Sequence, residues 1–163
     1  MQRIYQNRIY HWNGKVWLDR DFLQVPEKLA GELSAHYLDE LLDPGRPDWM
    51  ETIVHLRRAG EDLANRATLR LVARACRARL AVRPDESPTV ALLSSALRHL
   101  GQPARAEEVT RAYLDPAVLT SRAAALCDLG LWEEAKKTVA LALRHGGGKH
   151  ALQVRGRIHA RRG

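Results

Sequence analysis

The feature that most constrains the fold is a pattern that occurs twice, 29 residues apart. In each copy a Leu-Gly pair follows one apolar helical stretch and precedes another, and the two glycines are Gly101 and Gly130. An alanine follows five residues after each glycine, as Ala106 and Ala135. Glycine allows the left-handed turn that ends a helix, and a small alanine side chain lets two helices pack closely. The sequence therefore predicts a short array of repeated helix pairs.

Composition agrees with a helical, globular chain. Of the 163 residues 45% are hydrophobic and 28% are charged, and the frequent Ala, Leu and Arg are good helix formers. No window of 18 uninterrupted apolar residues is present, so we expect no membrane span and no membrane partner. The predicted fold class is mainly α, with a short array of antiparallel helix pairs.

The later copy resembles the tetratricopeptide repeat. It carries Gly130, then Trp132, then Glu134-Ala135, and a small Ala142 two turns further on. The earlier copy has Gly101, Ala106 and Tyr113 in matching positions, but Pro103 replaces the aromatic residue, and Arg122 in the later copy stands where the family prefers an apolar residue. The spacing of 29 is shorter than the 34 residues usual for the family. The resemblance covers roughly residues 65–145.

The resemblance implies a scaffold that binds a protein partner. In this family the first helices of successive repeats line a concave groove that holds a peptide or a helix. Transferred by position, the groove would display small residues such as Ala91, Ala124 and Cys127 beside the polar candidates for partner binding, which are Ser95, Arg98, His99, Thr120 and Asp128. One subclass of the family grips a C-terminal carboxylate with Lys and Asn, and those residues are absent here.

The part of the chain before the repeats contains three expected helices. The first begins at Pro26, which suits a first helical turn, the second spans roughly 49–59 and is ended by Gly60, and the third spans about 61–82. We therefore divide the chain into a hairpin at 1–24, a helical pair at 25–60, repeats at 61–146 and a basic helix or tail at 147–163.

The N-terminal segment predicts a β-hairpin. Asn13-Gly14 suits a two-residue type I′ turn, which would set Trp12 opposite Lys15 and Tyr10 opposite Trp17. Tyr10, Trp12 and Trp17 then share one face as candidate contact residues, and the other face is also partly apolar. An isolated two-stranded hairpin is marginal in water, so it must pack on its own helices, on a second copy or on a partner.

Positive charge is concentrated in two segments. The formal net charge is +7, yet Leu63–Pro84 and Arg144–Gly163 each contain six Lys or Arg and no acid. Four arginines fall within an arc of about 80° on the third helix. Nucleic acid, an acidic protein and water remain alternative environments for these side chains, of which the candidates are Arg66, Arg70, Arg74, Arg77, Lys149, Arg155, Arg157, Arg161 and Arg162.

No catalytic or metal-binding pattern stands out. The stretch HGGGKH at 145–150 lacks the first glycine and the Ser or Thr of a phosphate-binding loop, and it follows a helix instead of a strand. We expect no enzyme activity, no cofactor and no metal. Cys76 and Cys127 are predicted to be buried free thiols, and the N-terminus lacks the apolar centre of a signal peptide, so we expect a cytoplasmic protein.

These patterns together predict a non-enzymatic adaptor that binds a protein partner as a subunit of a larger assembly. The alternative is a nucleic-acid-binding accessory protein that uses the arginines of the third helix and the basic tail. Self-association through the hairpin stays open.

Overall fold

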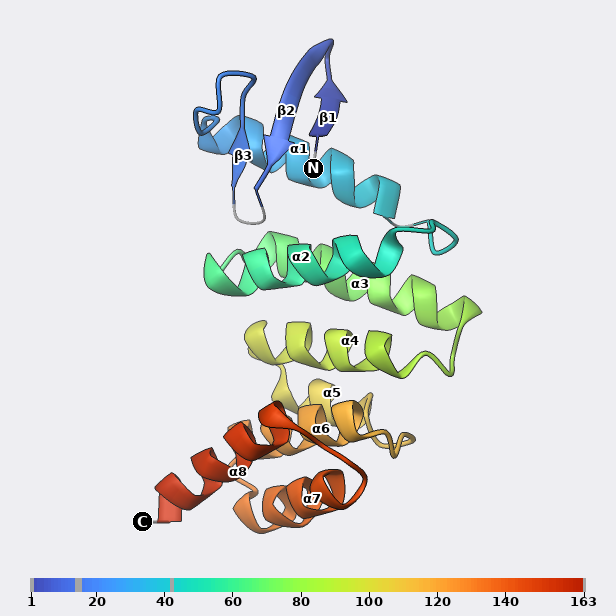
Figure 1. The fold of residues 1–163 in the computed structure, drawn as a ribbon, viewed down its shortest axis with the longest axis vertical. Helices are drawn as coiled ribbons and strands as arrows, with labels where there is room; N and C mark the ends of the chain where they lie inside the picture. The colour runs from blue at the N-terminus through green and yellow to red at the C-terminus, as the bar shows by residue number, and fades with distance from the viewer. Residues whose placement is uncertain (1, 14–15, 42, 163) are drawn as a thin grey trace. The chain divides into compact units, whose positions relative to one another are not determined.

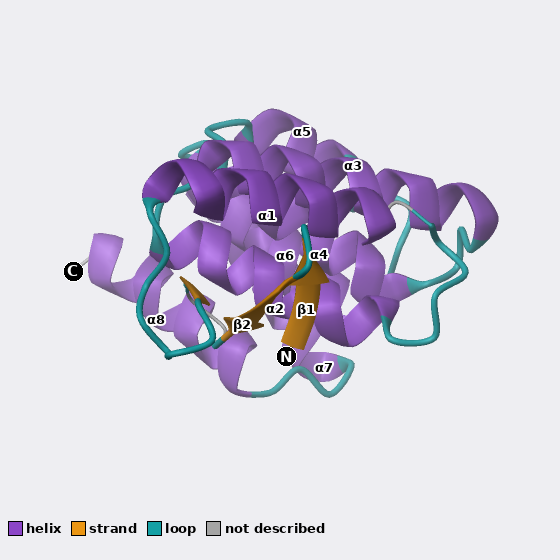
Figure 2. Cartoon of the chain, turned by 90° about the horizontal axis from the view of Figure 1, so that it is seen from above, coloured by secondary structure: helices purple, strands orange, loops and turns teal. Residues whose placement is uncertain are grey.

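The computed structural model describes residues 2–13, 16–41 and 43–162. Within these residues the chain forms eight helices and a small antiparallel sheet, and Figure 2 shows how little strand there is beside the helices. The mainly helical fold class is therefore confirmed. The chain divides into two compact units, Met1–Arg79 and Leu80–Gly163, which we describe in turn. None of the helices within the described ranges combines the length and the apolarity that crossing a membrane needs.

The sheet of the first unit has three strands in the order β1-β2-β3. They are β1 (Gln2–Tyr5), β2 (Arg8–Trp12) and β3 (Trp17–Leu18). The two-residue turn joins β1 to β2 at Gln6 and Asn7, whose φ angles are 50° and 62°. Two positive φ angles in a two-residue loop are the mark of a type I′ turn. The strand β1 and its turn were not expected from the sequence.

The predicted register of the second hairpin is wrong by two residues. Trp12 pairs with Trp17, and His11 pairs with Leu18, so the loop is longer than Asn13-Gly14 alone. Asn13 closes this loop because its side-chain oxygen accepts a hydrogen bond from the amide of Val16 at 2.9 Å. A shift of two residues preserves which side chains share a face.

The sheet packs on the helix α1 (Glu27–Leu41) through its aromatic face (Figure 1). The indole of Trp17 donates a hydrogen bond to Ser34 Oγ at 3.0 Å and meets the ring of Tyr37 edge-on, with 6.0 Å between centroids. The guanidinium of Arg3 lies 4.9 Å from the centre of the Tyr37 ring. Aromatic side chains bury a large apolar area, so these contacts fix the sheet on α1.

The first unit also contains α2 (Trp49–Asp62) and α3 (Arg66–Val82) as far as Arg79. Gly60 was expected to end the second helix, but the helix continues two residues beyond it and the third helix begins only at Arg66. Gly60 is buried, and a Cβ there would lie 3.0 Å from the side chain of Leu69. This glycine therefore permits a close approach to α3 instead of terminating α2.

The second unit consists of helices that pack as successive pairs. They are α4 (Ser87–His99), α5 (Pro103–Glu108), α6 (Pro116–Asp128), α7 (Trp132–Arg144) and α8 (Lys149–Arg162). Each helix packs on the next along the chain, and α6 also packs on α4 and on α8 (Figure 1). This is the packing of an array in which α4, α6 and α8 are first helices and α5 and α7 are second helices.

The repeat that the sequence predicts has the same backbone geometry in both copies. Gly101 and Gly130 have φ angles of 74° and 75°. The amide after each glycine bonds to a carbonyl five residues earlier at 2.9 Å, from Gln102 to Leu97 and from Leu131 to Leu126. Both helices therefore end in a Schellman turn. The alanines of both copies, 106 and 135, are fully buried where the second helix meets the first.

The first copy departs from the second in the length of its second helix. Regular helix stops at Glu108, and from Thr110 on the amides bond three residues back instead of four. The Thr110 hydroxyl bonds to the carbonyl of Glu107 at 2.6 Å, which competes with continued helix. The buried carboxylate of Glu107 also binds Arg111 and, at 3.3 Å, Arg122. This ion pair gives the charged side chain of Arg122 a partner inside the array.

The basic C-terminal segment folds as α8 and covers the end of the array. Ala151 and Ile158 are buried in a cluster that includes Leu126, Val139 and Ala142. Before α8, Gly147 lies so close to the preceding helix that a Cβ would be 2.7 Å from the Ala142 carbonyl oxygen. The segment is thus a packed helix and not a solvated tail.

Candidate functional site

Three charged residues meet across α4, α6 and α8. Asp128 accepts a hydrogen bond from Arg98 Nε at 2.7 Å and one from an Arg157 terminal nitrogen at 2.8 Å. Their side chains are 21%, 23% and 46% exposed for Arg98, Asp128 and Arg157 in that order. We call this group the Arg-Asp-Arg cluster. It carries one positive charge in excess, because two guanidinium groups share one carboxylate.

The cluster keeps Asp128 ionised. Partial burial on its own would raise the pKa of the carboxyl group, but hydrogen bonds and the positive charge of both arginines outweigh burial and lower it. The guanidinium groups remain charged at any ordinary pH. The carboxylate therefore orients Arg98 of α4 and Arg157 of α8, which are 59 residues apart in the chain.

The other residues predicted for the groove differ in how far they are exposed. His99 Nδ1 lies 2.9 Å from the Ser95 carbonyl oxygen, and the Thr120 hydroxyl bonds to the Pro116 carbonyl at 2.7 Å. Ser95 and Thr120 are half-buried, and His99 is exposed. Ala124 and Cys127 were expected to face the groove as well, but both are buried. Cys127 packs among the core side chains of this unit, where burial raises the pKa of its thiol.

The four arginines that the helical spacing places in one stripe on α3 are all exposed, whereas the fifth arginine of this helix, Arg79, is buried. The opposite side of the helix is buried, through Leu69, Val72 and Cys76. No carboxylate in the described part of the chain pairs with the three that follow Arg66, which are Arg70, Arg74 and Arg77. We call these three residues the α3 arginines.

The basic residues of α8 have different environments. Arg157 belongs to the Arg-Asp-Arg cluster, and Arg161 lies 5.8 Å from the centre of the Trp132 ring. Lys149 and Arg155 are exposed, and the side chain of Arg162 lies outside the described residues. The α3 arginines belong to the first compact unit and α8 to the second, so the two basic segments are separate candidate surfaces.

The aromatic residues proposed as a hairpin contact are buried inside the first unit. Tyr10, Trp12 and Trp17 are 6%, 9% and 1% exposed. Of the three alternatives that the sequence left open for this face, the structure shows packing on the protein's own helices. The outer face of the sheet, with Ile4 and Ile9, remains exposed and is the face that self-association would have to use.

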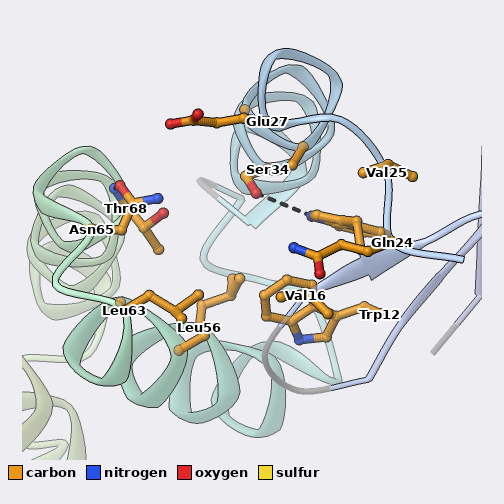
Figure 3. A pocket seen from close by; sticks show the side chains of 15 residues that line it. Trp12, Val16, Gln24, Val25, Glu27, Ser34, Leu56, Leu63, Asn65 and Thr68 are labelled. Carbon is orange, nitrogen blue, oxygen red and sulfur yellow. Dashed lines mark hydrogen bonds between the residues drawn. The ribbon is translucent and has the colours of Figure 1, made fainter.

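A cavity of about 470 Å³ lies in the first unit and was not predicted from the sequence (Figure 3). Its walls come from β2, β3 and the loop after it, from α1 and α2, and from the start of α3. Apolar and polar side chains both line it, among them Trp12, Trp17, Gln24, Glu27, Leu56 and Asn65. The one signal that could have revealed it is a pair of small neighbours on each of two helices, Ala30-Gly31 and Ala59-Gly60, which leave space between the helices.

Neither metal ligands nor known relatives give further guidance. Across the described ranges, no three His, Cys, Asp or Glu side chains gather closely enough to hold a metal ion. No protein-family model, no curated protein and no solved structure matches this chain. The resemblance to tetratricopeptide repeats stays a prediction, and function has to be inferred from the surfaces described above.

Proposed function

We propose that this protein is a non-enzymatic adaptor that binds an acidic segment of a protein partner on the face of α4, α6 and α8. The observation that carries the proposal is the Arg-Asp-Arg cluster, because it joins all three first helices of the array. Each guanidinium has five N–H donors, and Asp128 engages only some of them. The remaining donors can bind a partner carboxylate, which forms strong charge-assisted hydrogen bonds with arginine.

The surroundings of the cluster favour an acidic partner. The helix α8 contains no Asp or Glu, and its Lys149 and Arg155 are exposed. Asp128 holds two arginines in place before binding, so less side-chain entropy is lost when a partner arrives. We place this adaptor in the cytoplasm as a subunit of a larger assembly, a location supported by its two free, buried cysteines.

The test is site-specific photocrosslinking in nuclease-treated lysate of cells that express the protein. A photoreactive amino acid at position 95 is expected to capture a discrete protein, whereas the same group at the exposed position 140 on α7 is expected not to. Arg157→Glu should reduce the yield at position 95 at least severalfold. Arg144→Glu is the matched control, because it makes the same charge change on the exposed side of α7. Equal capture from both positions, or equal loss with both variants, contradicts the proposal.

A second candidate function is nucleic-acid binding through the α3 arginines. It is favoured by their exposure on one helix face without a paired carboxylate in the described part of the chain. Arginine suits phosphate because its planar group makes two parallel hydrogen bonds.

The test is fluorescence anisotropy with a labelled single-stranded oligonucleotide, measured over a range of salt concentrations. Each phosphate contact adds about −0.7 to the slope of log affinity against log salt. Replacing all three α3 arginines with Gln should therefore make the slope shallower by about 2. An unchanged slope, or no measurable binding by the unaltered protein at low salt, excludes this function for the α3 arginines.

A further inference from the structure

We propose that the cavity of the first unit binds a small organic amine with an apolar body. This site is independent of the adaptor surface, because all of its lining residues belong to Met1–Arg79 and the Arg-Asp-Arg cluster belongs to the second unit. The proposal rests on the size of the cavity, on its aromatic wall and on the sign of its charge.

The size suits a small molecule. Ligand sites in proteins commonly have volumes of about 300–1,000 Å³, and this cavity has about 470 Å³. Small residues line it on both helices, as Ala30 and Gly31 on α1 and Ala59 and Gly60 on α2. At Gly31 a Cβ would find no atom within 4 Å, so a ligand can lie against the backbone of α1.

The wall beside β2 and β3 is aromatic and held in a defined orientation. The indoles of Trp12 and Trp17 lie 5.3 Å apart between ring centres and are tilted by 52°. The hydrogen bond from Trp17 Nε1 to Ser34 Oγ fixes one of these rings (Figure 3). Trp12 is 9% and Trp17 1% exposed, so the exposed part of Trp12 supplies most of the aromatic contact that a ligand can reach. An indole attracts a positive charge more strongly than any other side-chain ring.

Among the described residues, the charge of the lining has the opposite sign to that of the chain. The protein carries a formal net charge of +7, yet the only charged residue among the described lining residues is Glu27. Glu27 lies at the rim and is exposed, on the first turn of α1, and the other polar lining groups are amides and hydroxyls such as Gln24 and Thr68. A carboxylate at the rim, with no cationic side chain among the described lining residues, attracts a cation and repels an anion. The lining therefore favours a ligand that has an ammonium group attached to an apolar body.

The experiment titrates the ¹⁵N-labelled full chain with three probes of similar shape: phenethylammonium, neutral 2-phenylethanol and the anion 3-phenylpropanoate. The readout is the indole N–H resonances of Trp12 and Trp17, with the resonance of Trp132 as the internal reference because it lies in the second unit. We expect saturable shifts of the first two resonances with phenethylammonium, weaker binding of the alcohol and no binding of the anion.

Two variants test the site itself. Gly31→Leu places a side chain into the empty space and should abolish binding, while replacing a helix-interior glycine improves helix propensity and keeps the fold. Glu27→Gln should weaken phenethylammonium binding about two- to fivefold, as expected for an exposed ion pair. Glu32→Gln is the matched control, because Glu32 is exposed on the same helix and does not line the cavity.

The following results would contradict the amine class, the cavity as the site, or the role of Glu27. The site is not an amine site if no probe gives saturable shifts, or if the alcohol or the anion binds as tightly as the amine. The cavity is not the site if Gly31→Leu, with an unchanged circular dichroism spectrum, binds phenethylammonium as well as the unaltered protein does. Equal effects of Glu27→Gln and Glu32→Gln exclude Glu27 as the recognising carboxylate.

Discussion

Among the described residues, four helix ends use the same left-handed turn, and one of them lacks glycine. Gly101, Gly130 and Gly146 have positive φ angles at three of these ends, and Ala64, with φ 51°, takes the same place after α2. The amide of Asn65 bonds to a carbonyl five residues earlier at 2.9 Å, as in the other three turns. The glycine positions could be predicted from sequence, whereas an alanine in this conformation gives no signal.

Ala64→Gly is therefore expected to stabilise the protein. An L-residue in the left-handed region costs about 1–2 kcal/mol, and glycine avoids most of this cost. The Ala64 side chain is exposed, so little contact is lost. We expect the free energy of unfolding to rise by about 1 kcal/mol in urea denaturation followed by circular dichroism.

The control for Ala64→Gly is Gly101→Ala, which places an alanine in the same strained conformation. A Cβ at position 101 would meet no atom within 4 Å, so any loss of stability reports the backbone alone. We expect a loss of about 1 kcal/mol. If Ala64→Gly destabilises the protein while Gly101→Ala does not, the turn geometry at both sites is wrong.

At the scale of elements, periodicity predicted the helices well and their ends less well. Apolar spacing predicted the first and third of the helices expected before the repeats, because the buried side of a helix needs that spacing. Gly60 misled the assignment, since a glycine that ends a helix and one that admits a neighbouring Leu69 look alike in a sequence. The strand β1 was missed because the turn at Gln6 and Asn7 contains no glycine.

Two substitutions in α8 test whether this basic helix contributes to the stability of the fold. Ile158 is 1% exposed and packs in the core cluster of the second unit, whereas Leu152 on the same helix is 47% exposed. Truncating a buried isoleucine costs about 2–5 kcal/mol. We expect Ile158→Ala to lower the free energy of unfolding by about that amount in urea denaturation, and Leu152→Ala to change it by less than about 0.5 kcal/mol. Equal effects would mean that α8 is not docked.

At the scale of the whole molecule, composition revealed the excess of positive charge but not its arrangement. Arg157 was assigned with the basic tail and Asp128 with the groove, yet they bind each other. Asp128 and Arg157 are separated by 29 residues, which is also the spacing between the two copies of the repeat. Extending the repeat to α8 would therefore have placed them at equivalent positions of neighbouring first helices, where side chains can meet. The cavity of the first unit depends on how a sheet and three helices meet, and no local pattern encodes that arrangement.

The Arg-Asp-Arg cluster makes stability depend on pH in a defined direction. The pKa of Asp128 is lower in the folded protein than in the unfolded chain, so folding favours the ionised form. The stabilisation is complete above the unfolded-state pKa, which is about 3.9, and is lost as the pH falls through the lower folded-state pKa. At neutral pH the cluster therefore adds to the stability of the packed helices α4, α6 and α8, and acid removes this contribution.

Asp128→Asn should remove this contribution and its pH dependence together. At pH 7 we expect the variant to be less stable by about 1 kcal/mol, the magnitude of a well-formed, partly exposed ion pair. At pH 2.5 to 3 the difference from the unaltered protein should shrink, because protonated Asp128 resembles asparagine. Urea denaturation at both pH values measures the difference, and Asp85→Asn serves as the control because Asp85 is an exposed carboxylate outside the cluster. A difference of the same size at both pH values would show that Asp128 stabilises the array through packing and not through its charge.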